Sequence, residues 1–125
     1  MTRTLSLLTL FIAATSAASA QTLPSETKGK VVYDKWCVHC HGSIGSTSRY
    51  TPDGLLPGTS ALTVKYQGRV PAVLSDRTDL GPAYIKSVVR KGLFGMPISR
   101  KTEISDADLE DVVAYLTRNR GERKR

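Results

Sequence analysis

The chain has 125 residues, a formal net charge of +7 at pH 7, and hydrophobic residues at 40% of its positions. This length and composition predict one globular domain with a modest core, which excludes a multidomain enzyme. The basic balance favours an acidic protein as partner, with a solvated basic surface that binds nothing as the alternative. The chain has only two cysteines, and both belong to a single motif, so no structural disulfide is expected.

Residues 1–20 predict a cleavable secretory signal. Arg3 provides a basic start, residues 5–14 form a short apolar run, and Ala18-Ser19-Ala20 matches an A-x-A cleavage site. An apolar run of about ten residues is too short to span a bilayer, so a retained membrane anchor is the weaker alternative. Cleavage after Ala20 leaves residues 21–125 as one domain. We therefore expect the mature protein in the periplasm, without stable membrane insertion and without a nucleic acid partner.

The first helix of the mature chain is predicted from about residue 25 to residue 40. Apolar and small residues recur there at the spacing of one helix face. Gly29 within this face costs about 1 kcal/mol relative to alanine. A close crossing with another helix would explain that cost, and a surface glycine is the alternative. The residues on the predicted face are Gly29, Val32, Tyr33, Trp36, Cys37 and Cys40.

The sequence Cys-Val-His-Cys-His at residues 37–41 carries the main functional signal. C-x-x-C-H is the attachment signature of c-type haem. Cys37 and Cys40, three residues apart on a helical turn, are spaced to form thioethers with the two vinyl groups of one porphyrin. His41 is then placed to bind the iron through an imidazole nitrogen. The motif predicts one covalently bound haem c.

Three other sites built on a C-x-x-C pair fit the sequence less well. A zinc site takes ligands from two separated pairs, whereas His39 and His41 crowd the same turn and no second pair follows. A thioredoxin-like pair lies at a helix N-terminus, whereas these cysteines are expected at a C-terminal end. A plain structural disulfide would leave His41 without a role.

Residues 42–68 are rich in Gly, Ser, Thr and Pro, and they predict a long loop with a short helix near residues 61–66. An irregular stretch of this length is unusual in a compact domain unless it wraps around something, and haem is the candidate. We expect the Pro57 carbonyl to accept a hydrogen bond from His41, which would fix the imidazole ring. The candidates to bind the haem propionates, each with a surface position as the alternative, are Tyr66, Arg69 and Arg77.

Two further helices are predicted towards the C-terminus. The first starts at Pro82 and ends at Gly92. The second begins at Ser105, with Asp108 in a variant of the capping box, and ends near Arg120. No alternating strand pattern competes, so we predict an all-α domain of three main helices. The buried stripes are Ile85, Val88 and Val89 in the first helix, and Leu109, Val112, Val113 and Leu116 in the second.

Met96 is the predicted second axial ligand, because it is the only methionine of the mature chain and follows the end of a helix. Gly95 lets the backbone approach a ring, and Pro97 stiffens the exit. A core methionine is the alternative. A thioether opposite His41 favours the ferrous state and raises the reduction potential. Two filled axial positions argue against oxygen or peroxide chemistry, so no catalytic residue is assigned.

Together these features resemble those of a class I c-type cytochrome. The resemblance covers essentially all of residues 21–125. It implies a class I cytochrome c fold, in which three to four helices surround one covalently bound haem and the first and last helices cross at Gly29. It also implies electron transfer through an exposed haem edge rather than catalysis. The matching residues are Gly29, Tyr33, the motif at 37–41, Met96-Pro97 and Tyr115-Leu116.

A narrower resemblance is carried by residues 77–80 and 96–106. These stretches are similar to the small cytochrome subunits of flavocytochromes that oxidise 4-alkylphenols, such as p-cresol methylhydroxylase and eugenol hydroxylase. In that family a separate FAD-containing subunit oxidises the phenol, and the cytochrome accepts electrons one at a time for a downstream acceptor. Family members usually carry Gly-Pro soon after the motif, whereas here Gly42 is followed by Ser43 and Leu56-Pro57 comes much later.

The resemblance thus implies an electron-transfer subunit that serves an FAD-containing dehydrogenase. Two alternatives stand beside it: a free soluble shuttle that serves other dehydrogenases or oxidases, and a haem enzyme with an open iron site. Arg100 and Lys101 follow Met96 closely in the sequence. We therefore expect them at the edge of the docking surface, where charges set the association rate.

Overall fold

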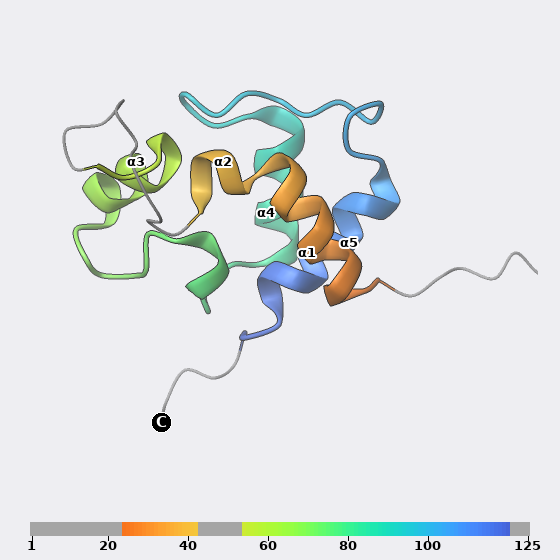
Figure 1. Cartoon of the computed structure of the whole chain (residues 1–125), viewed down its shortest axis with the longest axis horizontal. Helices are drawn as coiled ribbons and strands as arrows, with labels where there is room; N and C mark the ends of the chain where they lie inside the picture. Colours follow the sequence, from red (N-terminus) through yellow and green to blue (C-terminus); the bar gives the residue numbers. More distant parts are fainter. Residues whose placement is uncertain (1–23, 43–53, 121–125) are drawn as a thin grey trace, which may run out of the picture.

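The fold is built from helices, and the computed structural model describes residues 24–42 and 54–120 (Figure 1). Within these residues no β-strand forms, apart from an isolated antiparallel bridge between Leu93 and Met96. The predicted all-α fold is therefore confirmed. In chain order the elements are α1 (Glu26–Trp36), α2 (Val38–His41), α3 (Pro57–Tyr66), the 3-10 helix η1 (Leu74–Asp76), α4 (Pro82–Lys91) and α5 (Asp106–Thr117).

The helix that the sequence predicts over residues 25–40 is in fact two helices. Ser25 caps α1, and its hydroxyl oxygen accepts a hydrogen bond from the Lys28 amide. Cys37 ends α1 with a φ of −113°, well outside the usual helical value. In α2 the amides of Cys40 and His41 both donate to the Cys37 carbonyl, at 3.1 and 2.9 Å. The prediction of one helix was wrong, because the spacing of apolar residues does not reveal a change of backbone conformation at a single residue such as Cys37.

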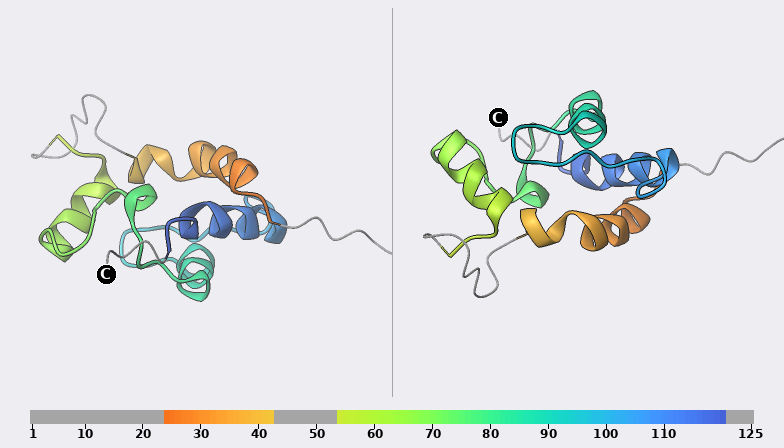
Figure 2. Two further views of the ribbon diagram at one scale, coloured as in Figure 1. Left: turned by 90° about the horizontal axis from the view of Figure 1, so that it is seen from below. Right: turned by 90° about the horizontal axis from the view of Figure 1, so that it is seen from above.

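α1 and α5 cross at Gly29 and lie side by side in both views of Figure 2. A β-carbon at Gly29 would lie 1.9 Å from the Asp111 carbonyl oxygen and 2.8 Å from Tyr115 Cβ, so only glycine fits. Asp111 Oδ1 also accepts a hydrogen bond from the Ser25 amide at 2.6 Å. Next to the crossing, the rings of Tyr33 and Tyr115 pack with centroids 5.3 Å apart. The predicted helix crossing is confirmed.

We expect Gly29→Val to lower the free energy of unfolding by about 3 kcal/mol or more, because the added side chain meets α5 backbone that cannot move without separating the helices. Denaturant unfolding followed by circular dichroism measures this loss. Ala61→Val, at an exposed position of α3, is the matched control and should cost about 0.5 kcal/mol. A loss for Gly29→Val no larger than the control's would show that the two helices do not need this close contact.

α4 and α5 begin where the sequence signals place them. Pro82 is the first residue of α4. The Ser105 hydroxyl oxygen accepts a hydrogen bond from the Asp108 amide at 3.0 Å and so caps α5. α5 ends at Thr117 rather than near Arg120. Of the two predicted stripes, only Val88 lies outside the hydrophobic core, which consists of Tyr33, Leu80, Ile85, Val89, Ile104, Leu109, Val112, Val113 and Leu116.

α3 is longer than the short helix predicted near residues 61–66. It begins at Pro57, whose fixed φ suits the first helical position, and it ends at Tyr66. The proline start signal was therefore present in the sequence, but the surrounding Gly, Ser and Thr residues masked it. In Figure 1, α3 lies beside α2, next to the cysteine motif.

Part of the prediction falls outside the described residues, namely the secretory signal at residues 1–20 and residues 43–53 of the expected loop. Over residues 24–42 and 54–120, none of the helices combines the length and the apolar character needed to cross a membrane.

Candidate cofactor site

The two cysteines of the motif lie where α1 passes into α2. Both are free thiols, with Cys40 exposed and Cys37 half-buried against the hydrophobic core. Burial, with a smaller contribution from the neighbouring Cys40, raises the pKa of the Cys37 thiol to about 11. A thiol that stays protonated at neutral pH is unsuited to thioredoxin-type exchange, which needs a thiolate. The structure therefore argues against a thioredoxin-like redox pair, as the sequence predicts.

His41 ends α2, and its imidazole packs against the backbone of α3. A β-carbon at Gly58 would lie 2.5 Å from Cε1 and 2.7 Å from Nδ1 of the ring. Nδ1 is buried, and no group in the described part of the chain hydrogen-bonds to it. Burial lowers the pKa of His41 from its ordinary value, so the ring is neutral at pH 7. A neutral imidazole is the form that binds a metal.

The hydrogen bond expected from His41 to the Pro57 carbonyl does not form among the described residues. The ring instead contacts Gly58, the next residue along the chain. α3 thus fixes the imidazole by close backbone packing, which requires glycine at this position. Because Cε1 and Nδ1 face Gly58, Nε2 is the ring nitrogen left for a metal.

Two hydroxyl groups hold the backbone of the motif in place. The Tyr33 hydroxyl donates to the His41 carbonyl at 2.9 Å, and Thr59 Oγ1 donates to the Gly42 carbonyl at 3.0 Å. Thr59 is 1% exposed, so this buried bond ties α3 to the end of α2. The sequence predicts Tyr33 only as a packing residue and does not mark Gly58 or Thr59. No spacing pattern identifies residues that reach the motif only through space.

Met96 lies in a tight turn that follows α4. The Leu93 amide donates to the Met96 carbonyl at 3.2 Å, and the Met96 amide donates to the Leu93 carbonyl at 2.9 Å. Phe94 and Gly95 form the tip of this turn. The Met96 side chain is half-buried and packs against the hydrophobic core, as does Cys37. In both views of Figure 2, α2 and the loop after α4 lie on opposite sides of the region beside α3, which suits ligands on opposite faces of one ring.

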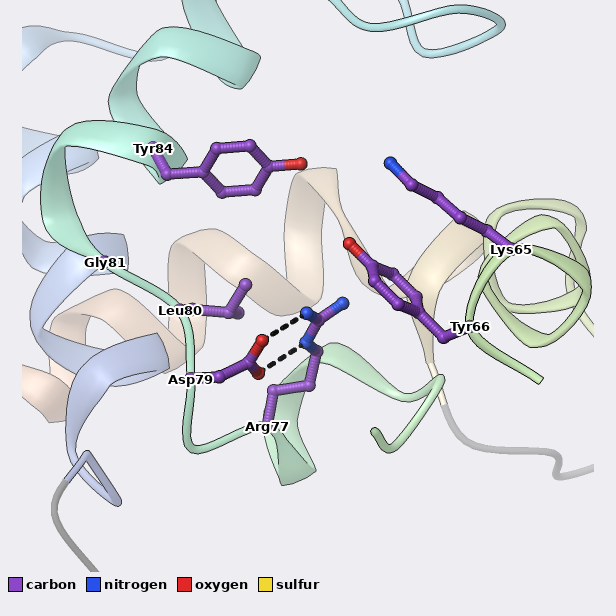
Figure 3. Close-up of a pocket in the computed structure, with 7 residues that line it drawn as sticks. All are labelled: Lys65, Tyr66, Arg77, Asp79, Leu80, Gly81 and Tyr84. Carbon is purple, nitrogen blue, oxygen red and sulfur yellow. Dashed lines mark hydrogen bonds and ion pairs between the residues drawn. The ribbon is translucent and has the colours of Figure 1, made fainter. Parts of the chain in front are cut away.

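A cavity of about 370 Å³ lies between α3 and the start of α4 (Figure 3). Arg77 in its wall is 3% exposed and donates two hydrogen bonds to Asp79, at 2.9 and 2.6 Å. The Arg77 guanidinium also stacks 4.4 Å from the centroid of the Tyr66 ring. Bidentate pairing and stacking hold the guanidinium in one orientation. The lining residues are Lys65, Tyr66, Arg77, Asp79, Leu80, Gly81 and Tyr84.

The structure brings together two of the three predicted propionate-binding residues. Tyr66 and Arg77 share the cavity wall, and their contact lowers the pKa of the Tyr66 phenol from its ordinary value. Arg69 instead folds back on the end of α3, where it donates to the carbonyls of Tyr66 and Lys65 at 3.1 and 3.4 Å. Lys65, which the sequence does not mark, takes a place in the wall. The wall holds two cations and one carboxylate, Asp79, so its net charge is +1, which together with the two phenol hydroxyls suits a carboxylate group.

These observations fit haem c as the group for which the site is built. The two thiols are free and lie on one turn, and the adjacent imidazole is neutral and lacks a hydrogen bond at Nδ1. Met96, on a separate loop, carries a soft thioether sulfur, and a cavity of net positive charge suits the acidic edge of the porphyrin.

Comparison with known protein families agrees with this donor set. The model of the family described as cytochrome c oxidase, cbb3-type, subunit III matches residues 24–116. The matched residues contain the cysteine motif, α3, the Met96 turn and nearly all of α5. No curated protein and no solved structure matches the chain.

Proposed function

The chain belongs to the cytochrome c family described as cytochrome c oxidase, cbb3-type, subunit III, and we propose that it binds one haem c through Cys37 and Cys40. Family membership makes it an electron-transfer protein with covalently bound haem c, and its helices agree with the class I cytochrome c fold. Beyond family membership, we propose that one haem is bound, that Cys37 and Cys40 form its thioethers, and that His41 and Met96 are the axial ligands of the iron. Haem c supplies reversible one-electron chemistry when it is bound.

The main support for this proposal is the environment of His41. The imidazole is neutral, is fixed against Gly58, and directly follows Cys40. A buried imidazole in a structural role normally uses its nitrogens in hydrogen bonds. Nδ1 has no such bond in the described part of the chain, so the ring has no evident structural role there. Binding of the iron through Nε2 would give the imidazole ring a role.

The turn around Met96 supports an iron with both axial positions filled. Two backbone hydrogen bonds between Leu93 and Met96 close the turn, and the thioether already packs against the core. A haem enzyme with an open iron site would need this side chain to leave. The protein therefore carries electrons and leaves the oxidation of substrate to a partner.

We infer that this partner is an FAD-containing dehydrogenase that oxidises 4-alkylphenols. The resemblance of residues 77–80 and 96–106 to cytochrome subunits of such enzymes supports it, as does a net charge of +7, which suits an acidic partner. Oxidation of one phenol releases two protons to solvent and two electrons to the flavin. The cytochrome takes one electron at a time, so two cytochrome turnovers reoxidise one flavin. It then passes each electron to a downstream acceptor in the periplasm, where the predicted signal would deliver it.

Stopped-flow mixing of oxidised holocytochrome with a purified FAD-containing 4-alkylphenol dehydrogenase and 4-methylphenol tests this partnership. We expect haem reduction only when both the flavoprotein and the phenol are present, with two cytochromes reduced for each phenol oxidised. Mixtures that lack either component are the controls. Reduction no faster than in those controls would contradict the partnership.

The family description names a subunit of a terminal oxidase, which favours such an oxidase as the acceptor. A second candidate function is therefore a shuttle that delivers electrons to a terminal oxidase without serving the flavoprotein. Reduced holocytochrome would then support steady oxygen consumption by a purified cbb3-type oxidase. Oxygen consumption without any reduction by the flavoprotein would make the shuttle the better account.

A further inference from the structure

The chain that leaves the Met96 turn is attached to the end of α4 at a single residue, Ser99. Its amide donates to the Val89 carbonyl at 2.8 Å, and its carbonyl accepts a hydrogen bond from Arg90 Nη1 at 3.0 Å. Val89 and Arg90 are neighbours in the last turn of α4, the helix that precedes the Met96 turn. Residues 92–98 therefore form a loop whose two ends meet at the same point of α4.

The first half of this loop is built tightly around the Met96 backbone. Gly92 follows α4 with a φ of 73°, and a β-carbon there would lie 2.7 Å from the Met96 carbonyl oxygen. The two backbone hydrogen bonds between Leu93 and Met96 then close the turn on itself. The turn can therefore move only as a unit. Among the described residues, the next backbone hydrogen bond after it is the one at Ser99, so this attachment limits how far the turn can move.

The Arg90 side chain joins three elements at this attachment. Its Nη1 bonds to the Ser99 carbonyl, and its Nη2 donates to Asp106 Oδ1 at 3.0 Å, at the first residue of α5. The other oxygen of the same carboxylate accepts a hydrogen bond from Lys101 Nζ at 2.6 Å. A planar guanidinium can hold two partners in fixed directions, which an ammonium group cannot do. Arg90 thus fixes the loop to α4 and α5 together.

Of the two contacts of Arg90, the bond to the Ser99 carbonyl contributes more to holding the loop. Asp106 is 62% exposed, and an ion pair with so exposed a partner adds little stability. The Arg90 side chain is only 21% exposed, and a hydrogen bond from a cation to a carbonyl is stronger than one between neutral groups. Asp106 mainly orients the guanidinium towards the carbonyl.

We propose that Arg90 is a positioning residue for the axial ligand Met96, because its bond to the Ser99 carbonyl opposes the loop movement that would take the sulfur off the iron. This inference rests on the proposed function, since it requires Met96 on the iron. A thioether is a soft ligand and favours ferrous over ferric iron. In the oxidised protein the sulfur is therefore held most weakly by the metal, and the loop contacts decide how often it leaves.

Imidazole titration of the oxidised holoprotein tests the role of Arg90. Imidazole can bind only when the sulfur has left, so its apparent affinity reports the population with an open loop. We expect Arg90→Leu to raise this affinity about tenfold. Without imidazole, the variant should keep the wild-type reduction potential and the sulfur-to-iron charge-transfer band. Asp106→Asn should raise the affinity by less than about threefold, because the bond to Ser99 remains.

Lys86→Leu is the matched control. Lys86 lies one turn earlier in α4 and pairs with Glu110 of α5, so the variant also breaks an ion pair between the two helices. Neither Lys86 nor Glu110 belongs to the loop. Its imidazole affinity should stay within about twofold of the wild type.

Hydrogen exchange of the Ser99 amide in the oxidised holoprotein reports loop opening without any added ligand. We expect Arg90→Leu to speed this exchange about tenfold and to leave the exchange of the Val112 amide, in the core of α5, within about twofold of the wild type. Lys86→Leu should leave the Ser99 amide at its wild-type rate. Faster exchange at Ser99 and Val112 alike would indicate a general loss of stability and would overturn the specific role of Arg90.

The outcomes separate this inference from the function on which it rests. If the wild type shows the charge-transfer band, equal imidazole affinities for Arg90→Leu and Lys86→Leu would overturn the role of Arg90 alone. A wild type without the band would overturn Met96 as the ligand, and the role of Arg90 with it. Where Arg90→Leu gives no folded holoprotein, Arg90→Lys replaces it, with an expected rise of about threefold, because lysine keeps the charge but lacks the paired donors. An affinity equal to that of the wild type would then overturn the inference.

Discussion

Met96→Ala is expected to convert the closed electron carrier into a protein with an open iron. The sulfur-to-iron charge-transfer band should disappear, and the reduction potential should fall on the order of 0.2 V, because a thioether stabilises the ferrous state and axial ligands set haem potentials over a range of about 0.8 V. Carbon monoxide and imidazole should then bind readily. Absorption spectroscopy and potentiometry of the purified holoprotein measure all three changes.

The control for this variant is Ile98→Ala, at a 56% exposed position of the same loop. It should retain the band, the potential and the resistance to carbon monoxide. If Met96→Ala keeps the wild-type spectrum and potential, the thioether is a packing residue, as its contact with the core also allows. The second axial ligand would then have to come from another part of the chain.

Removing both thiols is expected to abolish covalent haem attachment. Cys37→Ala with Cys40→Ala should give a protein whose haem extracts fully into acidified acetone and whose band on a denaturing gel no longer stains for haem peroxidase activity. Each single variant should weaken the stain, because one thioether remains. His39→Ala, between the two cysteines and exposed, is the control and should stain like the wild type. A wild-type haem that extracts fully would contradict thioether attachment.

The parts of the fold that the sequence predicts well are those specified by local chemistry. Pro82 and Ser105 start helices because a fixed φ or a capping hydroxyl acts within one turn. Gly29 is also predictable, because a helix-interior glycine needs a reason and a close crossing supplies one. The break at Cys37 is not, because it depends on one backbone angle that leaves the apolar spacing intact.

The candidate site likewise has parts that the sequence predicts and parts that it does not. The cysteine motif is contiguous in sequence, so its spacing predicts its chemistry without knowledge of the fold. The backbone contact of Gly58 with His41 and the buried hydrogen bond from Thr59 join α3 to α2, and neither has a sequence signal. The place of Arg100 also depends on the fold. The chain runs back along α4 after the Met96 turn, where the Ser99 amide donates to the Val89 carbonyl, and Arg100 pairs with Glu103 just before α5. Its role at the edge of a docking surface stays a prediction.

We expect the protein to carry electrons on one haem whose two axial positions are closed by His41 and Met96. Potentiometric titration of the wild-type holoprotein, with and without carbon monoxide, tests whether both positions are closed. We predict a single one-electron transition at the same potential under both conditions, because the ferrous iron has no free position for the gas. A potential that rises under carbon monoxide would show an open iron, which would contradict the electron-carrier account and favour a haem enzyme.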